Sequence, residues 1–268
     1  MERRSIFITG GGSGIGRAVA QHFAARGWFI GLADISQSGM DETEALLPAN
    51  SCYKHRLDVR ERTAWDEALA AFSVAAGGRI DVVFNNAGIG TGGLLEELDK
   101  GEIDTLIDIN FRGVVYGAQA ALPHLKNSAP GSALINTASA AALYGSGGLA
   151  LYAATKFAVR GLTEALDTEW QEHGITVASL MPSFIDTGIL VGPANKHSNM
   201  SKRDSVIKAG MEFTPVEVAA EIVWQAVHKG GKLHYLVGKT AKAMAFAARW
   251  MPGKLRERTR RLMETRRG

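Results

Sequence analysis

The chain has 268 residues, of which 46% are hydrophobic and 21% are charged, and its formal net charge is +3. This length and apolar content suit one large domain, or two small ones, with a sizeable core. The single cysteine, Cys52, excludes an internal disulfide, and no apolar run is long enough to span a membrane. The basic start is followed by too few apolar residues for a secretory signal, so we expect a cytoplasmic protein.

Short runs rich in β-branched and aromatic residues alternate with longer helical patterns along the chain. Such alternation predicts one doubly wound parallel sheet with helices on both faces, an α/β Rossmann fold. No repeat, proline-rich linker or low-complexity tract marks a second domain. The seven strands are expected at Ile6–Thr9, Trp28–Ala33, Ser51–Val59, Ile80–Asn85, Ser132–Thr137, Ile175–Met181 and His234–Val237.

A glycine-rich turn, TGGGSGIG, follows the first strand and opens the first helix. Glycines there permit a tight turn and let backbone N–H groups approach a pyrophosphate at the helix N-terminus. Asp34 ends the second strand, where a carboxylate can accept hydrogen bonds from an adenosine ribose. The combination predicts dinucleotide binding through Gly10, Ser13, Gly14, Ile15, Gly16, Asp34 and Ile35.

The acidic residue also favours NAD over NADP. A 2′-phosphate beside Asp34 would be repelled, and neither Ile35 nor Ser13 supplies a compensating cation. As an alternative, Asp34 is a turn or cap residue before Ser36.

The stretch LYAATKFAV places Tyr152 and Lys156 one helical turn apart, on one helix face. Alone, such a pair is more often a solvated surface feature than a site. Here it follows the fifth strand, which ends at Ser139, at the sheet edge where these folds bind ligands. The three side chains can surround a carbonyl or hydroxyl group, and we expect the lysine charge to lower the pKa of the tyrosine.

Two later segments interrupt the alternation. Residues 188–210 form a long irregular insert, which is predicted to be a lid over the site. After it, Thr214-Pro215-Val216-Glu217 predicts the start of a helix, with Thr214 as N-cap and Pro215 as first helical residue.

Residues 239–268 carry ten Lys or Arg against two Glu, so the tail has a charge of +8 and the rest of the chain −5. A solvated amphipathic end and a membrane-surface or partner contact both remain open; nucleic acid is not expected.

These motifs together resemble the short-chain dehydrogenase/reductase family, in the branch with TGxxxGxG and YxxxK motifs. The resemblance spans roughly residues 5–237. The matching residues are Thr9, Gly10, Gly14, Gly16, Asp58, Val59, Asn85, Asn86, Ala87, Gly88, Asn110, Ser139, Tyr152 and Lys156.

The resemblance implies roles for these residues. Tyr152 would be the general acid/base, Lys156 would lower its pKa and hold the nicotinamide ribose, Ser139 would polarise the substrate oxygen, and Asn110 would anchor a relay water. Read individually, Asn110 could be a buried amide at a helix kink and Ser139 a strand-end cap. Further cofactor contacts would come from Asp58, Val59, Asn86, Ala87, Gly88, Pro182, Ile185 and Thr187. Substrate contacts are expected from Ser139, Tyr144, Leu149, Tyr152, Phe184 and Leu190; no metal site is expected.

The chain departs from the family pattern at two places. Ser183 replaces a glycine of the loop after the sixth strand, and the last strand runs into a long tail in place of a short one. Met244, Phe246, Ala247, Trp250 and Met251 would form an apolar stripe, interrupted by Pro252, before a basic helix. The alternative is a helix packed back over the substrate cleft or against a second subunit.

The resulting expectation is an NAD-dependent oxidoreductase that interconverts a secondary alcohol and a ketone, with an apolar or aromatic small-molecule substrate. Residues 1–238 would form the NAD-binding domain with its catalytic site, and residues 239–268 a basic helical extension. The family implies a homodimer through helices near residues 101–126 and 152–173, or a homotetramer. The alternatives are an NADPH-dependent carbonyl reductase and a dinucleotide-binding regulator without turnover.

Overall fold

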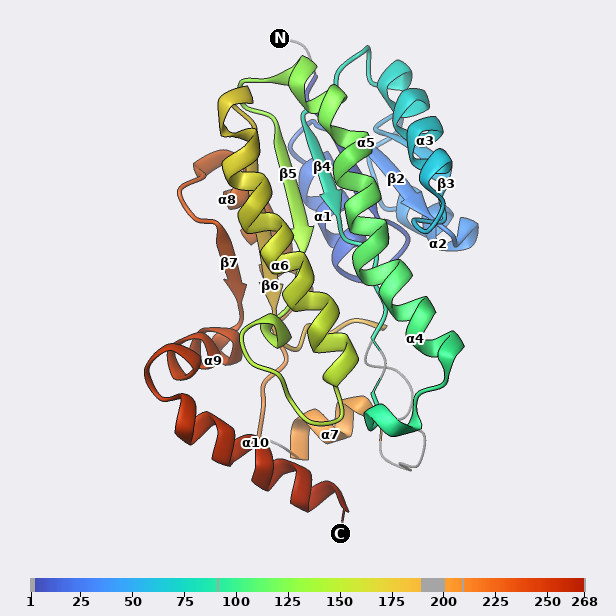
Figure 1. The fold of residues 1–268 in the computed structure, drawn as a ribbon. Helices are drawn as coiled ribbons and strands as arrows, with labels where there is room; N and C mark the ends of the chain where they lie inside the picture. The colour runs from blue at the N-terminus through green and yellow to red at the C-terminus, as the bar shows by residue number, and fades with distance from the viewer. Residues whose placement is uncertain (1–2, 91, 189–200, 209, 268) are drawn as a thin grey trace.

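A single seven-stranded parallel sheet forms the centre of the molecule, with strand order β3-β2-β1-β4-β5-β6-β7 (Figure 1). This parallel sheet, with helices on both faces, confirms the predicted α/β Rossmann fold. The computed structural model describes residues 3–90, 92–188, 201–208 and 210–267. The strands are β1 Ser5–Thr9, β2 Phe29–Asp34, β3 Cys52–Arg56, β4 Val82–Asn85, β5 Ala133–Thr137, β6 Thr176–Pro182 and β7 His234–Val237.

The third strand is shorter than predicted. It ends at Arg56, whereas the sequence pattern continues to Val59. The chain turns beyond it because Asp58 accepts hydrogen bonds from the backbone and the guanidinium of Arg60, two residues later. This local side-chain bonding competes with the ladder and ends the strand.

Helices cover both faces of the sheet, because parallel strands need crossover connections. On one face lie α1 (Gly14–Ala24), α2 (Gln37–Glu44) and α8 (Val216–Lys229); on the other lie α3 (Arg62–Ala75), α5 (Gly113–Ser128) and α6 (Ala150–Trp170) (Figure 1). The short helix α4 (Lys100–Ile107) leads into α5 through one π turn, Asp108–Arg112. Each face buries its own apolar cluster, around Phe23 and Ile30 on the first and around Phe7 and Trp65 on the second.

The start of α8 differs from the prediction. Pro215 is the N-cap and the helix begins at Val216, so Thr214 does not cap it. The reason is that Thr214 is extended: its N–H donates to the Phe184 carbonyl at 2.8 Å and its carbonyl accepts from Asp186 N–H at 3.2 Å. Thr214 thereby ties the loop after β6 to the start of α8.

All strands point toward one edge of the sheet, and the order reverses between β1 and β4. Ligands of open α/β sheets bind at such a switch point, outside the carboxyl ends of the strands. The same edge carries α7 (Lys202–Lys208), α9 (Lys239–Trp250) and α10 (Pro252–Arg267) (Figure 1). The predicted break at Pro252 is confirmed. Within the described ranges, no helix is long and apolar enough to cross a membrane.

Candidate active site

The glycine-rich turn adopts backbone conformations that favour glycine. Gly10 has φ +67° and Gly14 has φ +51°. A β-carbon on Gly16 would lie 2.1 Å from the Gly10 carbonyl oxygen, so only glycine lets the helix start so close to the loop. The first turn of α1 contains no acidic residue, and Ser13 makes no capping hydrogen bond with its side chain. The helix N-terminus is therefore electrostatically suited to an anion.

Asp34 lies directly against this turn. One carboxylate oxygen accepts from Gly12 N–H and the other from Ser36 N–H, both at 3.0 Å. The side chain thus also has the turn role considered as an alternative, and it fixes the rim of the crevice. Ile35 is 61% exposed and Ile15 packs against the core beneath the loop.

The loop after β4 is tied to the glycine turn by polar groups. The Thr9 hydroxyl accepts from Asn86 N–H at 3.0 Å and from Ala87 N–H at 3.1 Å, and the Asn86 amide donates to the Thr9 carbonyl at 3.0 Å. Thr137 adds a bond from its hydroxyl to the Asn86 amide oxygen. These contacts hold the carboxyl ends of β1, β4 and β5 together at the switch point.

Asp58 and Val59, which follow β3, are held in place by neighbouring residues. The Arg60 guanidinium, hydrogen-bonded to Asp58, holds the pKa of that carboxyl below its usual range. Val59 is buried, and its carbonyl accepts from the Trp65 indole at 3.0 Å. A β-carbon on Gly113 would lie only 2.9 Å from the Val59 side chain. Val59 therefore also packs the helix layer at the rim.

Asn110 lies in the π turn and is fully buried. Its amide oxygen accepts from Ile89 N–H at 2.8 Å and its amide nitrogen donates to the Ile89 carbonyl at 2.9 Å. It also reaches the Thr155 hydroxyl on α6 at 3.5 Å. Asn110 is thus also a buried amide at a helix irregularity, the alternative considered for it, and it joins the loop after β4 to the tyrosine-bearing helix.

Lys156 projects from α6 into the same place. It is buried, and its ammonium donates to the Thr137 carbonyl at 3.0 Å and lies 5.8 Å from the centroid of the Tyr152 ring. A β-carbon on Gly88 would lie 3.2 Å from the Asn110 amide oxygen and 3.5 Å from the Lys156 ammonium. Gly88 therefore lets Asn110 and Lys156 converge. Burial lowers the pKa of Lys156 to about 8.

Ser139 and Tyr152 form the other half of the cluster. Ser139 caps the short 3₁₀ turn Ala140–Ala142 by accepting from Ala141 N–H at 3.1 Å. Burial raises the pKa of Tyr152, and the neighbouring Ser139 hydroxyl lowers it by less. The pKa of the half-buried Tyr152 therefore lies above its ordinary value, opposite to the expected direction, because desolvation of the phenol outweighs the other contributions.

The loop after β6 closes the site over the glycine turn. A β-carbon on Gly14 would meet the Thr187 side chain at 3.3 Å. Pro182 accepts from the Ser139 hydroxyl at 3.5 Å, and Ile185 is buried beside Thr214. Ser183, in place of the family glycine, donates from its hydroxyl to the Val237 carbonyl at 3.0 Å. Asn50 is the only non-glycine residue with positive φ in the described part, so Ser183 does not adopt the left-handed conformation that favours glycine.

The expected substrate residues divide into described and undescribed ones. Tyr144, Leu149 and Phe184 are half-buried near the carboxyl edge, whereas Leu190 and residues 189–200 of the expected lid lie outside the described residues. The described part of this insert is not wholly irregular, since residues 202–208 form α7, tied to the loop after β6 by an ion pair between Arg203 and Asp186.

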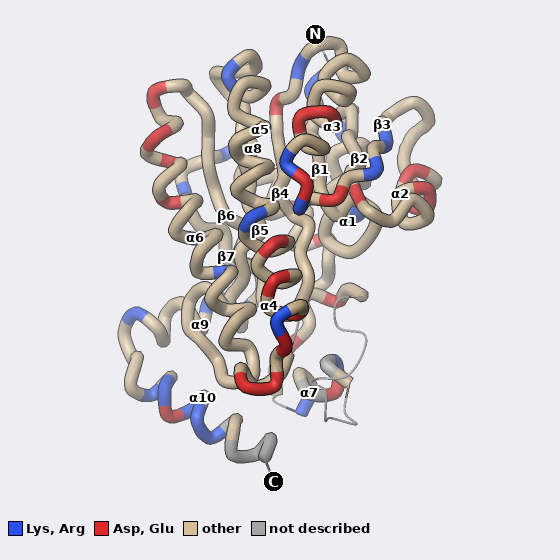
Figure 2. Tube along the Cα trace, turned by 45° about the vertical axis from the view of Figure 1, so that its right-hand side comes forward, with Lys and Arg blue, Asp and Glu red and all other residues tan. Residues whose placement is uncertain are grey.

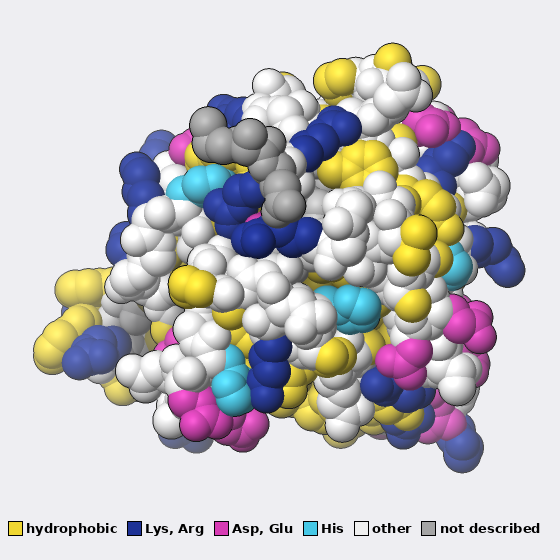
Figure 3. Space-filling view, turned by 90° about the horizontal axis from the view of Figure 1, so that it is seen from above, with side chains coloured by type: hydrophobic (Ala, Val, Ile, Leu, Met, Phe, Trp, Pro, Cys, Tyr) yellow, Lys and Arg dark blue, Asp and Glu magenta, His cyan; other side chains and the backbone are white. Residues whose placement is uncertain are grey.

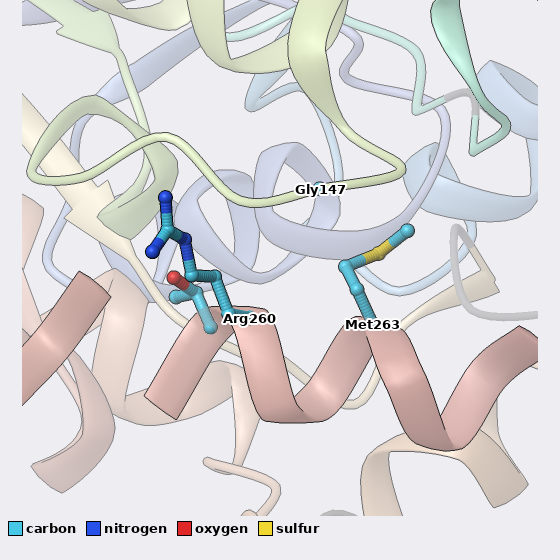
Figure 4. Close-up of a pocket in the computed structure, with 4 residues that line it drawn as sticks. Gly147, Arg260 and Met263 are labelled. Carbon is cyan, nitrogen blue, oxygen red and sulfur yellow. The ribbon is translucent and has the colours of Figure 1, made fainter. Parts of the chain in front are cut away.

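Two contributions were missed by sequence reasoning: the Thr137 carbonyl holds Lys156, and the Thr155 hydroxyl meets Asn110. The tail packs back on the body, one of the two alternatives for it, and α10 lies on the loop between β5 and α6, with Met263 against Gly147 (Figure 4). A backbone carbonyl leaves no sequence signal, and the contact with α10 is distant in sequence. Only Thr155, inside the YxxxK stretch, could have been found.

Comparison with known proteins agrees with this geometry. Residues 4–199 match the family model for short chain dehydrogenase. The chain is 32% identical to meso-2,3-butanediol dehydrogenase of Serratia marcescens over 84% of this chain and 88% of the relative. It is 36% identical to levodione reductase of Leifsonia aquatica over 80% of this chain and 79% of the relative.

A solved short-chain dehydrogenase/reductase from Burkholderia phymatum, in complex with NAD, has a similar fold. It superposes with a TM-score of 0.80 at 26% identity and covers 96% of this chain and 95% of its own. With the glycine turn, the YxxxK helix and the strand order in place, the chain belongs to the short-chain dehydrogenase/reductase family of oxidoreductases.

Proposed function

We propose that the protein is an NAD-dependent oxidoreductase that interconverts a secondary alcohol and a ketone. The observation that carries the proposal is the convergence of Ser139, Tyr152 and Lys156 beside the Asn110 amide. A phenol, a hydroxyl and a buried ammonium within one cluster are the groups that proton transfer to or from a substrate oxygen requires.

The residues at the switch point fit the cofactor. Gly10, Gly14 and Gly16 leave backbone N–H groups near the start of α1, and Asp34 presents a carboxylate where the adenosine ribose of NAD would lie. Bound NAD supplies hydride acceptance at the nicotinamide ring, or NADH supplies the hydride. Asp34 disfavours a 2′-phosphate by like-charge repulsion, which supports NAD over NADP.

The chain's own groups handle the proton. In reduction, the Tyr152 Oη–H donates its proton to the carbonyl oxygen as that oxygen gains negative charge, and Ser139 orients the oxygen through its hydroxyl. In oxidation, the phenolate oxygen takes the proton of the alcohol. The raised pKa of the phenol favours proton retention. We propose that the positive charge of Lys156, one turn along α6, offsets part of the cost of ionising the phenol when the phenolate forms.

The surroundings support an apolar or aromatic substrate. Tyr144, Leu149 and Phe184 present largely apolar side chains near the carboxyl edge. The names of the two enzymes above, a butanediol dehydrogenase and a levodione reductase, are those of proteins acting on an alcohol and a ketone. We infer the same class of reaction for this chain.

The proposal is tested with a panel of secondary alcohols and ketones, each assayed with NAD(H) and with NADP(H). Turnover of at least one pair, faster with NAD(H), is the expected result. Faster turnover with NADP(H) would replace the NAD assignment by the carbonyl-reductase alternative. Cofactor binding without turnover across the panel would favour the regulatory alternative.

We also propose a homodimer through α5 and α6, as the family implies. Phe157 on α6 is a large hydrophobic side chain that is 40% exposed in the single chain. Light scattering with chromatography measures the mass, and Phe157→Glu should shift a dimer toward the monomer. An unchanged dimer would place the interface elsewhere.

A further inference from the structure

An aromatic and basic face lies on the outer side of α9. Phe246 is 59% exposed, Trp250 is 65% exposed, and the following Met251 is 37% exposed. Phe246 and Trp250 are four residues apart and so share one helix face. The exposed Lys242 and Arg249 flank them, and the Arg249 guanidinium lies 5.3 Å from the Trp250 ring centroid.

Phe246 and Trp250 are exposed although α9 and α10 are themselves packed helices. On its inner side α9 buries Ala241, and α10, which packs against α9, buries Leu255. Trp250 is also unlike Trp28, Trp65 and Trp170, each of which is at most 5% exposed. The structure therefore holds a large aromatic side chain outward at a fixed place.

Cations extend this face along α10. Figure 2 shows Lys and Arg gathered on α9 and α10, whereas Asp and Glu are prominent on α2 and α4. At the opposite edge of the molecule, Figure 3 shows acidic and basic side chains interspersed. We call the exposed cationic and large apolar residues of α9 and α10 the C-terminal face; those that the structure describes are Lys239, Lys242, Phe246, Arg249, Trp250, Met251, Lys254, Arg256, Arg258, Arg260 and Arg261, with Glu257 among them as an exposed acidic residue.

We propose that the C-terminal face docks on an anionic phospholipid bilayer. Aromatic and apolar side chains at its surface can enter the boundary between headgroups and acyl chains, while the cations remain among anionic headgroups. Charge complementarity favours this occupant, because residues 239–268 carry +8 and the rest of the chain carries −5. The described helices are not of the kind that spans a bilayer, so α9 and α10 lie along its surface.

The loop from Tyr144 to Leu149, which carries two of the expected substrate contacts, would lie beside the membrane when the C-terminal face is docked. This loop contacts α10 at Gly147, where a β-carbon would lie 2.6 Å from Met263. A hollow of about 500 Å³ lies between them, lined by Gly147, Thr259, Arg260 and Met263 (Figure 4). If the proposed function holds, this arrangement favours a lipophilic alcohol or ketone that partitions into the bilayer.

Vesicle co-sedimentation tests the docking without requiring turnover. The protein is mixed with phosphatidylcholine vesicles prepared with and without phosphatidylserine. We expect binding that is at least about tenfold stronger with phosphatidylserine and that weakens with salt. Trp250 fluorescence should shift to the blue on binding, and Trp250→Phe should abolish the shift while retaining binding.

Two variants and a control identify the surface. Phe246→Ala with Trp250→Ala, and separately Lys254→Glu with Arg258→Glu, should each weaken vesicle binding at least about tenfold. Val74→Ala with Leu46→Ala removes exposed apolar side chains elsewhere, 82% and 54% exposed, and should leave binding unchanged. Circular dichroism and NAD binding verify that each variant is folded.

Several results would overturn the proposal. Absence of vesicle binding by the folded wild type, or equal binding by all variants, would refute docking through this face. Dissociation of an oligomer by the Phe246 and Trp250 substitutions, without vesicle binding, would assign the face to a second copy of the chain. Vesicle binding with no enzymatic turnover would keep the docking proposal and count against the proposed function alone.

Discussion

The cofactor side and the substrate side of the site are built differently. Around the glycine turn, polar atoms are joined by hydrogen bonds, as between Thr9 and the loop after β4 and between Asp34 and Gly12. On the substrate side, segments meet through apolar packing, as the Met263 side chain does with Gly147. The first region is therefore held by hydrogen bonds and glycine backbone geometry, and the second by apolar contacts. Small substitutions should therefore be far more damaging on the cofactor side.

The largest effect is expected at Gly16. Gly16→Ala would place a β-carbon 2.1 Å from the Gly10 carbonyl, so the turn must shift, with a loss of roughly 3 kcal/mol in stability and most NAD affinity. Gly253→Ala is the matched control, because a β-carbon on this residue of α10 would meet nothing within 4 Å; it should stabilise by about 0.5–1 kcal/mol. Thermal unfolding and calorimetric titration with NAD measure both. Equal behaviour of the two variants would contradict the backbone account.

Lys156 should give the protein a pH-dependent stability. Its folded pKa of about 8 lies below the ordinary value of 10.5, so the unfolded chain binds more protons between these pH values and stability rises with pH across that window. Relative to Lys156→Met, the wild type should gain on the order of 3 kcal/mol from pH 8 to 10.5. Urea unfolding across this pH range measures the difference. The exposed Lys229→Met should follow the wild type, and a parallel profile for Lys156→Met would refute burial of the charge.

Asp34 should control the choice of cofactor. Asp34→Ala removes the acceptor for Gly12 and Ser36 and the repulsion toward a 2′-phosphate. The ratio of kcat/KM for NAD to that for NADP should fall at least about tenfold, about 1.4 kcal/mol. Asp41→Ala, an exposed change on α2 that removes a partner of Lys54, should leave this ratio unchanged. An unaltered ratio in Asp34→Ala would show that cofactor choice is determined elsewhere.

The smallest effect is expected at Ser183, on the boundary between the two regions. Ser183→Ala loses the hydrogen bond to the Val237 carbonyl and should cost about 1 kcal/mol of stability. Ser183→Gly loses the same bond and adds backbone freedom, so it should cost slightly more. Denaturant unfolding compares them with the wild type. A variant as stable as the wild type would show that this bond contributes nothing.

The sequence predicted the sheet well because parallel strands buried on both faces are nearly continuous apolar runs. His234–Val237 was predicted with its observed bounds, and the other strands differ mainly at their ends. Those ends depend on local bonding that periodicity does not encode, as at Asp58, where a contact with Arg60 stops β3. Thr214 was assigned as an N-cap from its residue type, but tertiary pairing with Ile185 prevails.

The candidate site was predictable where chemistry depends on residue type at fixed spacing. The glycine turn and the YxxxK pair are of this kind, and the structure brings Ser139, Tyr152 and Lys156 together. The pKa direction of Tyr152 was not predictable, because it depends on how deeply the phenol is buried. A tail helix packed back over the cleft was one alternative, but its contact with the loop at Gly147 was not predictable, since no local pattern specifies which residues of a distant helix will meet a loop.

The central claim is that Tyr152 exchanges the proton in a reaction between a secondary alcohol and a ketone. Its most direct test is Tyr152→Phe, assayed for NADH formation with an accepted alcohol and for NAD affinity by calorimetry. The account predicts that turnover falls by about 10²–10⁴-fold while NAD affinity stays within roughly twofold of the wild type. Turnover within a few fold of the wild type in this variant would contradict it.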